Sequence, residues 1–413
     1  MEMFHGSFIS GTTECLADTL ELQRLDAAAH EIAGFSVEDL LLVLGFDNES
    51  GYNQYADRII QTTDGADVNQ MWREFQASIA LLNRQREPLV RLLSYLSQNI
   101  VERIFFPTDH DFEEASEYGV PRGVRLGAPF SLGFDFKWYD LAIRYTWMFL
   151  ADASQDQVRA LNASALEASV RLQFNKVLKA IFNNVDRTST NPNNNVAINV
   201  YPFYNADGMV PPTYKGTTFA GSHTHYYSSG GATITPVNIQ TLETDLYSHG
   251  YRNVEGYTLM LLVNRVEGLV IRGFRAGTAS AIYDFIPGPN FGGGVYMPAS
   301  LGIVGQPVPT APAGLNSIGT YGPFSIVEED YIPAGYVVAL ATGGEFNMGN
   351  PVGIREHQRS DLRGLQLVAG PDDDYPLTES YYRQGLGTGV RQRGGGAVMR
   401  ISASAYAIPA AYA

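Results

Sequence analysis

The amino-acid sequence predicts a protein of the α+β class. Two observations support this prediction. Residues 154–190 contain no glycine or proline and repeat their apolar residues at helical spacing, whereas the residues after 325 form the short apolar runs typical of strands. With 413 residues, the chain is long enough for two to three domains and a substantial core.

The composition is that of a folded protein. Hydrophobic residues make up 45% of the chain and charged residues 17%, unlike the composition of disordered chains. No window approaches the ~18 uninterrupted apolar residues of a membrane span. Glu2 follows Met1, and no basic-then-apolar run typical of a signal peptide comes after it. We therefore expect no membrane partner and expect synthesis and residence in the cytoplasm.

The charge balance argues against a tight grip on nucleic acid. The chain has 28 basic and 43 acidic residues, a formal net charge of −15, and no basic run. We expect any contact with DNA to be loose. All but four of the basic residues are arginines, which form bidentate ion pairs and are frequent at protein interfaces. The single cysteine, Cys15, excludes an intramolecular disulfide, and we interpret it as a small buried apolar residue.

The first hundred residues are predicted to be helical. Residues 12–32 carry a sparse apolar face, and Ser36 with Asp39 forms a capping signal before residues 40–44. A stronger pattern begins near Asp67 and continues after Pro88, with apolar residues three or four apart: Met71, Phe75, Ile79, Leu82, Leu89, Leu93, Leu96 and Ile100. We expect these faces to pack within their own domain, although amphipathicity alone does not exclude a partner.

Residues 119–150 are predicted to form an extended arm. Four glycines, at positions 119, 123, 127 and 133, lead into alternating apolar residues whose parity switches near Tyr139: Phe134, Phe136 and Trp138, then Leu141, Ile143, Tyr145, Trp147 and Phe149. The switch indicates a bulge or sharp twist. A strand that is apolar on both sides must be covered on both sides. We therefore expect this arm to form contacts that join subunits.

The segment after the arm predicts a long helix over residues 154–184. Ser154 and Gln157 form a capping box, Asp156 lies in the first turn, and the helix should end near Asn183 and Asn184. One stripe consists of Leu166, Val170, Phe174, Val177 and Ile181. At ~1.5 Å per residue, the helix should be roughly 45 Å long.

A second domain is predicted to begin near Thr235. Thr235 and Pro236 start a helix that Gly250 closes, and strand-like residues 258–263 follow. Residues 286–324 contain nine glycines and seven prolines among scattered aromatic residues, which indicates a long loop docked on a surface. Further strands are expected at residues 336–340, 354–357, 365–368 and 398–401.

Two histidines are the best candidates for a metal-binding or catalytic site. His223 and His225 would project from the same face of a strand and could bind a metal, with Asp284 or His249 as a third ligand. We favour a hydrogen-bonded structural pair, because the spacing selects no third ligand. The acidic runs at 328–330 and 372–374 lack the pattern of a calcium loop, and the glycine runs at 292–294 and 394–396 lack that of a P-loop. We therefore expect no catalytic residue, cofactor or metal.

The carboxyl-terminal third contains a block that resembles the major capsid proteins of tailed bacteriophages, particularly those infecting actinobacteria. The matching segments are residues 330–336 (DYIPAGY), 350–357 (NPVGIREH), 363–365 (RGL), 375–377 (YPL) and 385–393 (GLGTGVRQR). The resemblance extends back through residues 140–184 and 217–225 and covers the last two thirds of the chain. It implies the Hong Kong 97 capsid fold.

The resemblance also implies a division of the chain. Its parts would be a helical amino-terminal region and arm (1–118), an extended two-stranded loop (119–150), a peripheral domain (151–234) with its spine helix at 154–184, an axial domain (235–341) and return strands of the peripheral domain (342–413). In this scheme the extended loop lies over a neighbouring subunit, which would cover its two apolar faces. The expected interface residues are Phe134, Phe136, Trp138, Arg144 and Trp147.

The implied function is a capsid protein that assembles as hexamers and pentamers into an icosahedral head around double-stranded phage DNA. Expected partners are other copies of the chain, a scaffolding protein and portal during assembly, loosely held DNA, and a decoration protein. The virion is the expected location, after assembly in the host bacterial cytoplasm. Two alternatives stay open: an encapsulin-like protein compartment, and a metal-dependent hydrolase that uses His223 and His225.

Overall fold

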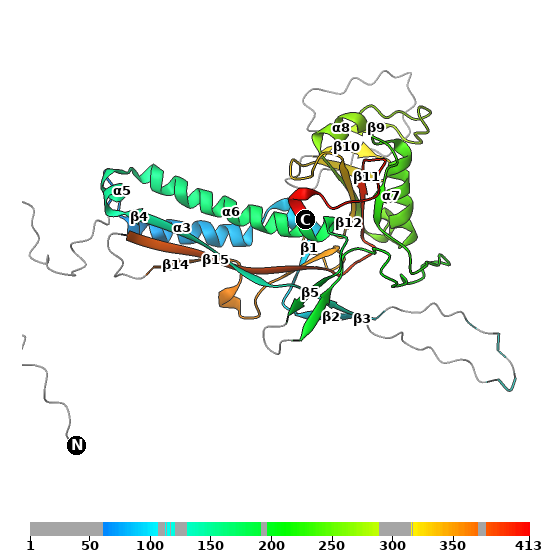
Figure 1. The fold of residues 1–413 in the computed structure, drawn as a ribbon, viewed down its shortest axis with the longest axis horizontal. Coiled ribbons are helices and arrows are strands. Elements are labelled where there is room, and N and C mark those ends of the chain that lie inside the picture. Colours follow the sequence, from blue (N-terminus) through cyan, green and yellow to red (C-terminus); the bar gives the residue numbers. More distant parts are fainter. Residues whose placement is uncertain are drawn as a thin grey trace, which may run out of the picture. The chain divides into compact units, whose positions relative to one another are not determined.

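The computed structural model describes residues 61–105, 112, 114–115, 117–119, 130–190, 196–288, 315, 317–370 and 377–413 (Figure 1). The helices expected within residues 12–44, Cys15, and the runs at 292–294 and 372–374 lie outside these residues. The chain divides into two compact units. The smaller contains Met1–Met71, Tyr145–Gln157 and Asp374–Thr378, and the larger contains Trp72–Arg144, Val158–Asp373 and Glu379–Ala413. No described helix is long and apolar enough to cross a membrane.

The predicted helix near Asp67 is confirmed as α3 (Val68–Arg84), and the helix after Pro88 is α4 (Pro88–Leu93). The prediction that α4 continues to Leu96 and Ile100 is wrong. The chain turns instead into strand β1 (Ser94–Ser97), which pairs in parallel with β13 (Val352–Arg355). The side-chain amide of Asn350 donates to the carbonyl oxygen of Ser94 at 2.8 Å. Tertiary pairing overrides the helical spacing here.

The long helix is confirmed as α6 (Gln155–Phe182), with 28 residues and a length of about 42 Å. The backbone N–H of Ser154 donates to the side-chain oxygen of Gln157 at 3.0 Å, which is one half of the predicted capping box. The preceding strand is shorter than predicted, because Trp147 starts a separate short helix, α5 (Trp147–Asp152). Thr146 caps α5 by accepting a hydrogen bond from the backbone N–H of Phe149.

Five strands form the first sheet, in the order β1, β13, β15 (Leu377–Val390) and β14 (Leu365–Ala369), with β4 (Lys137–Thr146) also paired to β15. The strands predicted near residues 354–357 and 365–368 are confirmed as β13 and β14. The sequence did not predict β15, the longest strand of the described chain, because glycine occupies three of its last six positions.

Seven strands form the second sheet, in the order β7, β16, β12, β8, β11, β10 and β9. Their bounds are Tyr226–Ser228, Gly396–Arg400, Tyr336–Thr342, Thr258–Val263, Phe324–Glu328, Ser317–Tyr321 and Phe285–Pro287. The expected loop over residues 286–324 is therefore wrong at both ends, where β9 and β10 pair antiparallel. The sheet combines strands from the segments 151–234, 235–341 and 342–413.

The second sheet is buried on both faces. In β12, Val338 and Leu340 face a core that contains α4 and the carboxyl-terminal half of α6. Val337 and Ala339 face the opposite core, which contains α7 (Pro236–Ser248) and α8 (Arg265–Ile271). The predicted helix start at Thr235 is confirmed by a complete capping box. A sheet with two covered faces explains why these strands are apolar throughout.

Two smaller strand pairs and three short turns complete the described chain. Strand β2 (Val101–Ile104) pairs with β3 (Phe130–Gly133), and β5 (Arg187–Thr190) pairs with β6 (Ala197–Val200). The turns are 3₁₀ helices at Asn253–Glu255, Ser360–Leu362 and Ala410–Tyr412. Strand β3, which lies within the predicted extended loop at 119–150, thus pairs with a strand from the preceding segment of the chain.

Candidate subunit interface

The five expected interface residues differ in how far they are covered by their own chain. Phe134 is fully buried, and its ring packs beside Gly353 and Gly389. It belongs to the core of its own subunit and offers no free surface to another. The sequence suggested otherwise because the pattern of a strand does not say which apolar face is already covered.

A row of glycines holds the segment 134–138 against β15. Gly385, Gly387 and Gly389 occupy alternate positions of that strand, so their missing side chains lie on one face. A Cβ atom at Gly387 would overlap the carbonyl oxygen of Asp135. One at Gly385 would lie 2.6 Å from the ring of Phe136. Only glycine lets the two backbones approach this closely.

Phe136 and Trp138 form an aromatic cluster on this glycine row. Their ring centroids lie 5.4 Å apart in a T-shaped arrangement. The guanidinium of Arg355 lies 5.1 Å from the centre of the Phe136 ring, and the His357 ring lies 5.6 Å from that of Trp138. Trp138 is nevertheless 46% exposed. The cluster therefore fixes a large aromatic residue in place and leaves about half of it open.

The next part of β4 is open as well. Leu141 and Ala142 are exposed, and regular alternation of buried and exposed residues begins only at Ile143. The change to alternating burial therefore falls between Ala142 and Ile143, downstream of the parity switch predicted near Tyr139. Leu141 is 43% exposed, so a little under half of its surface is open to solvent. Exposed apolar residues grouped on one strand are typical of a surface that contacts another protein.

Arg144 is oriented by its own subunit. Its Nε atom lies 2.6 Å from Oε1 of Glu379, and its side chain is 58% exposed while that of Glu379 is 4% exposed. Hydrogen bonding to Tyr381 and the charge of Glu379 raise the pKa of Arg144. The guanidinium is thus positioned at the surface. In the smaller unit, Trp147 is 40% exposed at the first turn of α5.

The histidine pair belongs to a cluster that the sequence revealed only in part. His223 and His225 precede β7, and His249 caps α7. Their three Nε2 atoms lie 2.9 to 3.1 Å from one another. The fourth member is Asp245, which sequence reasoning missed. The sequence does contain a sign of this fourth member: Asp245 precedes His249 by four residues, a spacing that places both side chains on one face of a helix.

Asp284, the other ligand considered from the sequence, lies elsewhere. Its Oδ1 atom accepts a hydrogen bond from the backbone N–H of Ala276 at 3.0 Å. Burial lowers the pKa of His225 to about 4 and that of His249 to about 3. Both imidazoles are therefore neutral near pH 7.

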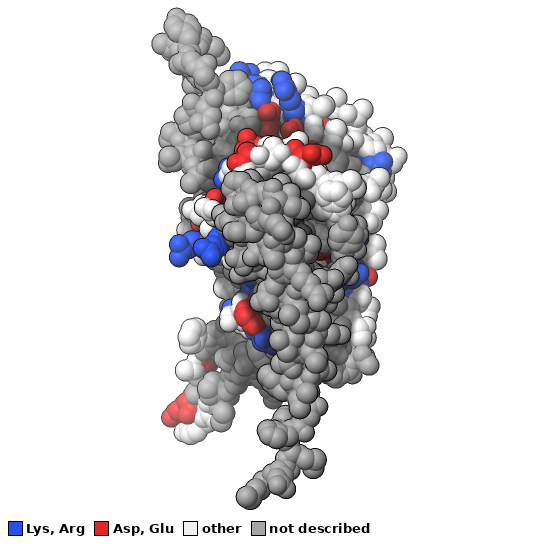
Figure 2. Space-filling model, turned by 90° about the vertical axis from the view of Figure 1, so that its left-hand side faces the viewer, with Lys and Arg blue, Asp and Glu red and all other residues white. Residues whose placement is uncertain are grey.

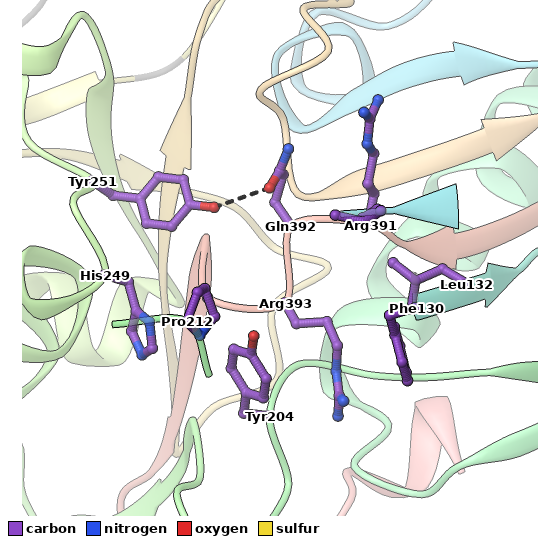
Figure 3. A pocket seen from close by; sticks show the side chains of 11 residues that line it. Phe130, Leu132, Tyr204, Pro212, His249, Tyr251, Arg391, Gln392 and Arg393 are labelled. Atoms are coloured by element: carbon purple, nitrogen blue, oxygen red, sulfur yellow. Dashed lines mark hydrogen bonds between the residues drawn. The ribbon is translucent and has the colours of Figure 1, made fainter. Parts of the chain in front are cut away.

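A small pocket adjoins the histidine cluster (Figure 3). Tyr204, His249, Tyr251 and Arg393 are among the residues that line it. The guanidinium of Arg393 lies 2.9 Å from Asp207 and 4.7 Å from the Tyr204 ring centre. The pocket holds only about 70 Å³, whereas sites for small organic ligands usually measure ~300–1,000 Å³. It has room for water or an ion.

Charges of both signs are mixed on the surface. On the face shown in Figure 2, neither basic nor acidic side chains form a continuous area among the described residues. Many arginines are paired with carboxylates of the same chain, as in Arg86–Glu356, Arg272–Glu328 and Arg391–Glu102. Such pairing leaves those guanidinium groups less available for phosphate.

One comparison with known structures decides the family. A solved chain of Mycobacterium phage Patience is 42% identical in sequence, and the similarity covers 86% of this chain and 94% of that one, with a TM-score of 0.67. The chain belongs to the major capsid proteins of tailed bacteriophages. This capsid protein has the Hong Kong 97 fold.

More distant structures add no argument to this assignment. The capsid protein is 12% identical to a chain of the capsid of a native GTA particle, covering 77% of this chain and 91% of that one with a TM-score of 0.43. It is also 12% identical to a chain of the bacteriophage PhiM1 mature capsid, covering 76% and 86% with a TM-score of 0.45. No protein-family model matches the sequence, and no curated protein matches it.

Proposed function

We propose that this capsid protein assembles as hexamers and pentamers into the icosahedral head that encloses the double-stranded DNA genome. The observation that carries the proposal is the surface of β4. Phe136 and Trp138 are fixed on the glycine row of β15, yet Trp138, Leu141 and Ala142 stay partly exposed to solvent. A rigid, exposed aromatic strand is suited to an interface between subunits.

The parts of the family fold can be assigned to this chain. We propose that the arm based on β2 and β3 is the extended loop and that α6 is the spine helix. Residues 235–341 would form most of the axial domain around the centre of each capsomer. The proposed interface residues are Phe136, Trp138, Arg144 and Trp147, whereas Phe134 supports them from the core.

The negative net charge of the chain supports a role as a shell whose inner surface does not bind DNA tightly. A formal net charge of −15 repels phosphate, so DNA could move along the inner surface during packaging. A scaffolding protein and portal would take part during assembly in the host cytoplasm, and a decoration protein could bind outside. The proposed role is structural, and no step of it requires catalysis or a cofactor.

Electron microscopy tests the proposal. The chain is expressed alone and together with the reading frames beside its gene, and the particles are purified and imaged. Closed shells or rings of six subunits are expected. A monodisperse monomer under both conditions would overturn the proposal. The molecules that co-purify with the shells distinguish the phage head from the alternative. Co-purified DNA supports a phage head, whereas a co-purified host enzyme supports an encapsulin-like compartment.

A further inference from the structure

The histidine cluster has the geometry of a metal site. The Nε2 atoms of His223, His225 and His249 form a triangle with sides of 2.9, 3.0 and 3.1 Å. Three imidazole nitrogens bound tetrahedrally to Zn²⁺ at ~2.0–2.1 Å would lie ~3.3 Å apart. Each nitrogen would have to move outward by only a few tenths of an ångström to admit the ion.

Hydrogen bonding alone does not satisfy this triangle. Nδ1 of His225 lies 2.7 Å from the carbonyl oxygen of Gly396, which can only accept, so Nδ1 carries the proton. In this tautomer of the neutral imidazole, Nε2 carries no proton, and its lone pair faces the other two histidines. The space between three nitrogens at this separation holds at most one proton. A metal ion would use all three lone pairs.

The hydrogen bond from His225 to the carbonyl oxygen of Gly396 is also typical of a metal-binding histidine. Metal-binding histidines usually donate their second ring N–H to a carbonyl or carboxylate, which fixes the tautomer and the direction of the lone pair. Two aromatic rings stack with that of His249: Phe219 at a centroid distance of 4.2 Å and Tyr204 at 5.7 Å. The lone pairs are therefore directed to one point before any ion binds.

Asp245 supplies the negative charge. Asp245 is only 7% exposed, and its Oδ2 atom lies 3.2 Å from Nδ1 of His225. Oδ1 lies 3.4 Å from Nε2 of His223. A carboxylate at this position would supply a negative charge to a cation bound between the three rings.

The nearest arginine does not cancel this charge. Arg393 is buried and is paired with Asp207 at 2.9 Å, so the two contribute no net charge beside the cluster. We propose that His223, His225 and His249, together with Asp245, bind one Zn²⁺ ion that ties α7 to the segment preceding edge strand β7. Nitrogen ligands with one carboxylate favour zinc over calcium or magnesium, which prefer oxygen ligands.

The site is structural in this proposal, and it goes beyond the assembly function. Edge strand β7 has only three residues and pairs only with β16 in the described sheet. The cluster joins the segment before it to the last turn of α7, across 26 residues between His223 and His249. A bound ion would therefore stabilise an edge of the second sheet that few backbone hydrogen bonds hold.

Metal analysis of the untagged full-length protein tests the proposal. Protein from zinc-supplemented cells is dialysed and its metal content measured by mass spectrometry, with about one Zn²⁺ per chain expected. Co²⁺ added to chelator-treated protein should give the intense visible bands of a tetrahedral site. Removing the metal should lower the melting temperature by several degrees, and added Zn²⁺ should restore it.

Variants identify the ligands. His223→Gln and His249→Gln should each lose most of the bound zinc and the Co²⁺ bands, whereas His357→Gln, which changes a histidine outside the cluster, should keep both. Circular dichroism confirms that each variant is folded. Wild-type protein with less than about a tenth of an ion per chain, and no change in melting temperature on zinc addition, would overturn the proposal without any variant. Equal zinc loss in His357→Gln would also overturn it.

Discussion

At the scale of single residues, missing side chains fix the position of the strand that we propose as a subunit interface. Gly387 brings the backbone of β15 against that of Asp135, and Gly385 makes room for the rings of Phe136 and Trp138. The sequence shows these glycines in a row of alternate positions. It does not show which segment fills the space, because that pairing spans about 250 residues of chain.

We predict that Gly387→Ala destabilises the folded subunit by at least ~2 kcal/mol, since the new methyl group would overlap a carbonyl oxygen that cannot move without its strand. Urea denaturation followed by circular dichroism measures the change. Gly231→Ala is the matched control, because the nearest atom would lie 4.0 Å from its Cβ. The control should change stability by less than about 0.5 kcal/mol. Equal stability of the two variants would contradict the packing described here.

At the scale of elements, local signals explain what the sequence could predict. Helices α6 and α7 were predicted closely because caps such as Ser154 and Thr235 lie within the helices' own sequence. Strand β1 was taken for helix because its pairing partner lies more than 250 residues away. The histidine cluster was found only in part for a different reason, because the packing of α7, and not the spacing in the sequence, brings Asp245 to His223 and His225.

Strand β4 is the element whose surface we expect to govern assembly. We predict that Trp138→Asp blocks shell closure and leaves the subunit folded, since a charge placed under a neighbouring chain costs several kcal/mol at each of many equivalent contacts. Sedimentation velocity and electron microscopy measure assembly, and circular dichroism measures the helix content. Trp138→Phe keeps an aromatic ring and should still form shells. Normal shells from Trp138→Asp would remove β4 from the interface.

At the scale of the whole molecule, the charge arrangement matters more than any single site. The chain has a formal net charge of −15. Arginines that could bind phosphate are paired with carboxylates, for example Arg159 with Glu74 and Arg187 with Asp135. A protein that neutralises six or more phosphates loses ~10³-fold or more in affinity between 50 and 200 mM salt. Such pairing leaves these guanidinium groups less available for phosphate contacts.

We therefore predict that the unassembled capsid protein binds double-stranded DNA too weakly to shift it in a gel, even at low salt. Fluorescence anisotropy of a labelled duplex should give a dissociation constant weaker than that of ordinary non-specific DNA-binding proteins, ~10⁻⁴–10⁻⁶ M, with little dependence on salt. The variant Asp135→Asn removes the carboxylate that is paired with Arg187 and should bind more tightly at low salt. Tight binding by the unmodified chain, with a steep salt dependence, would instead indicate a wall that holds the genome by its phosphates.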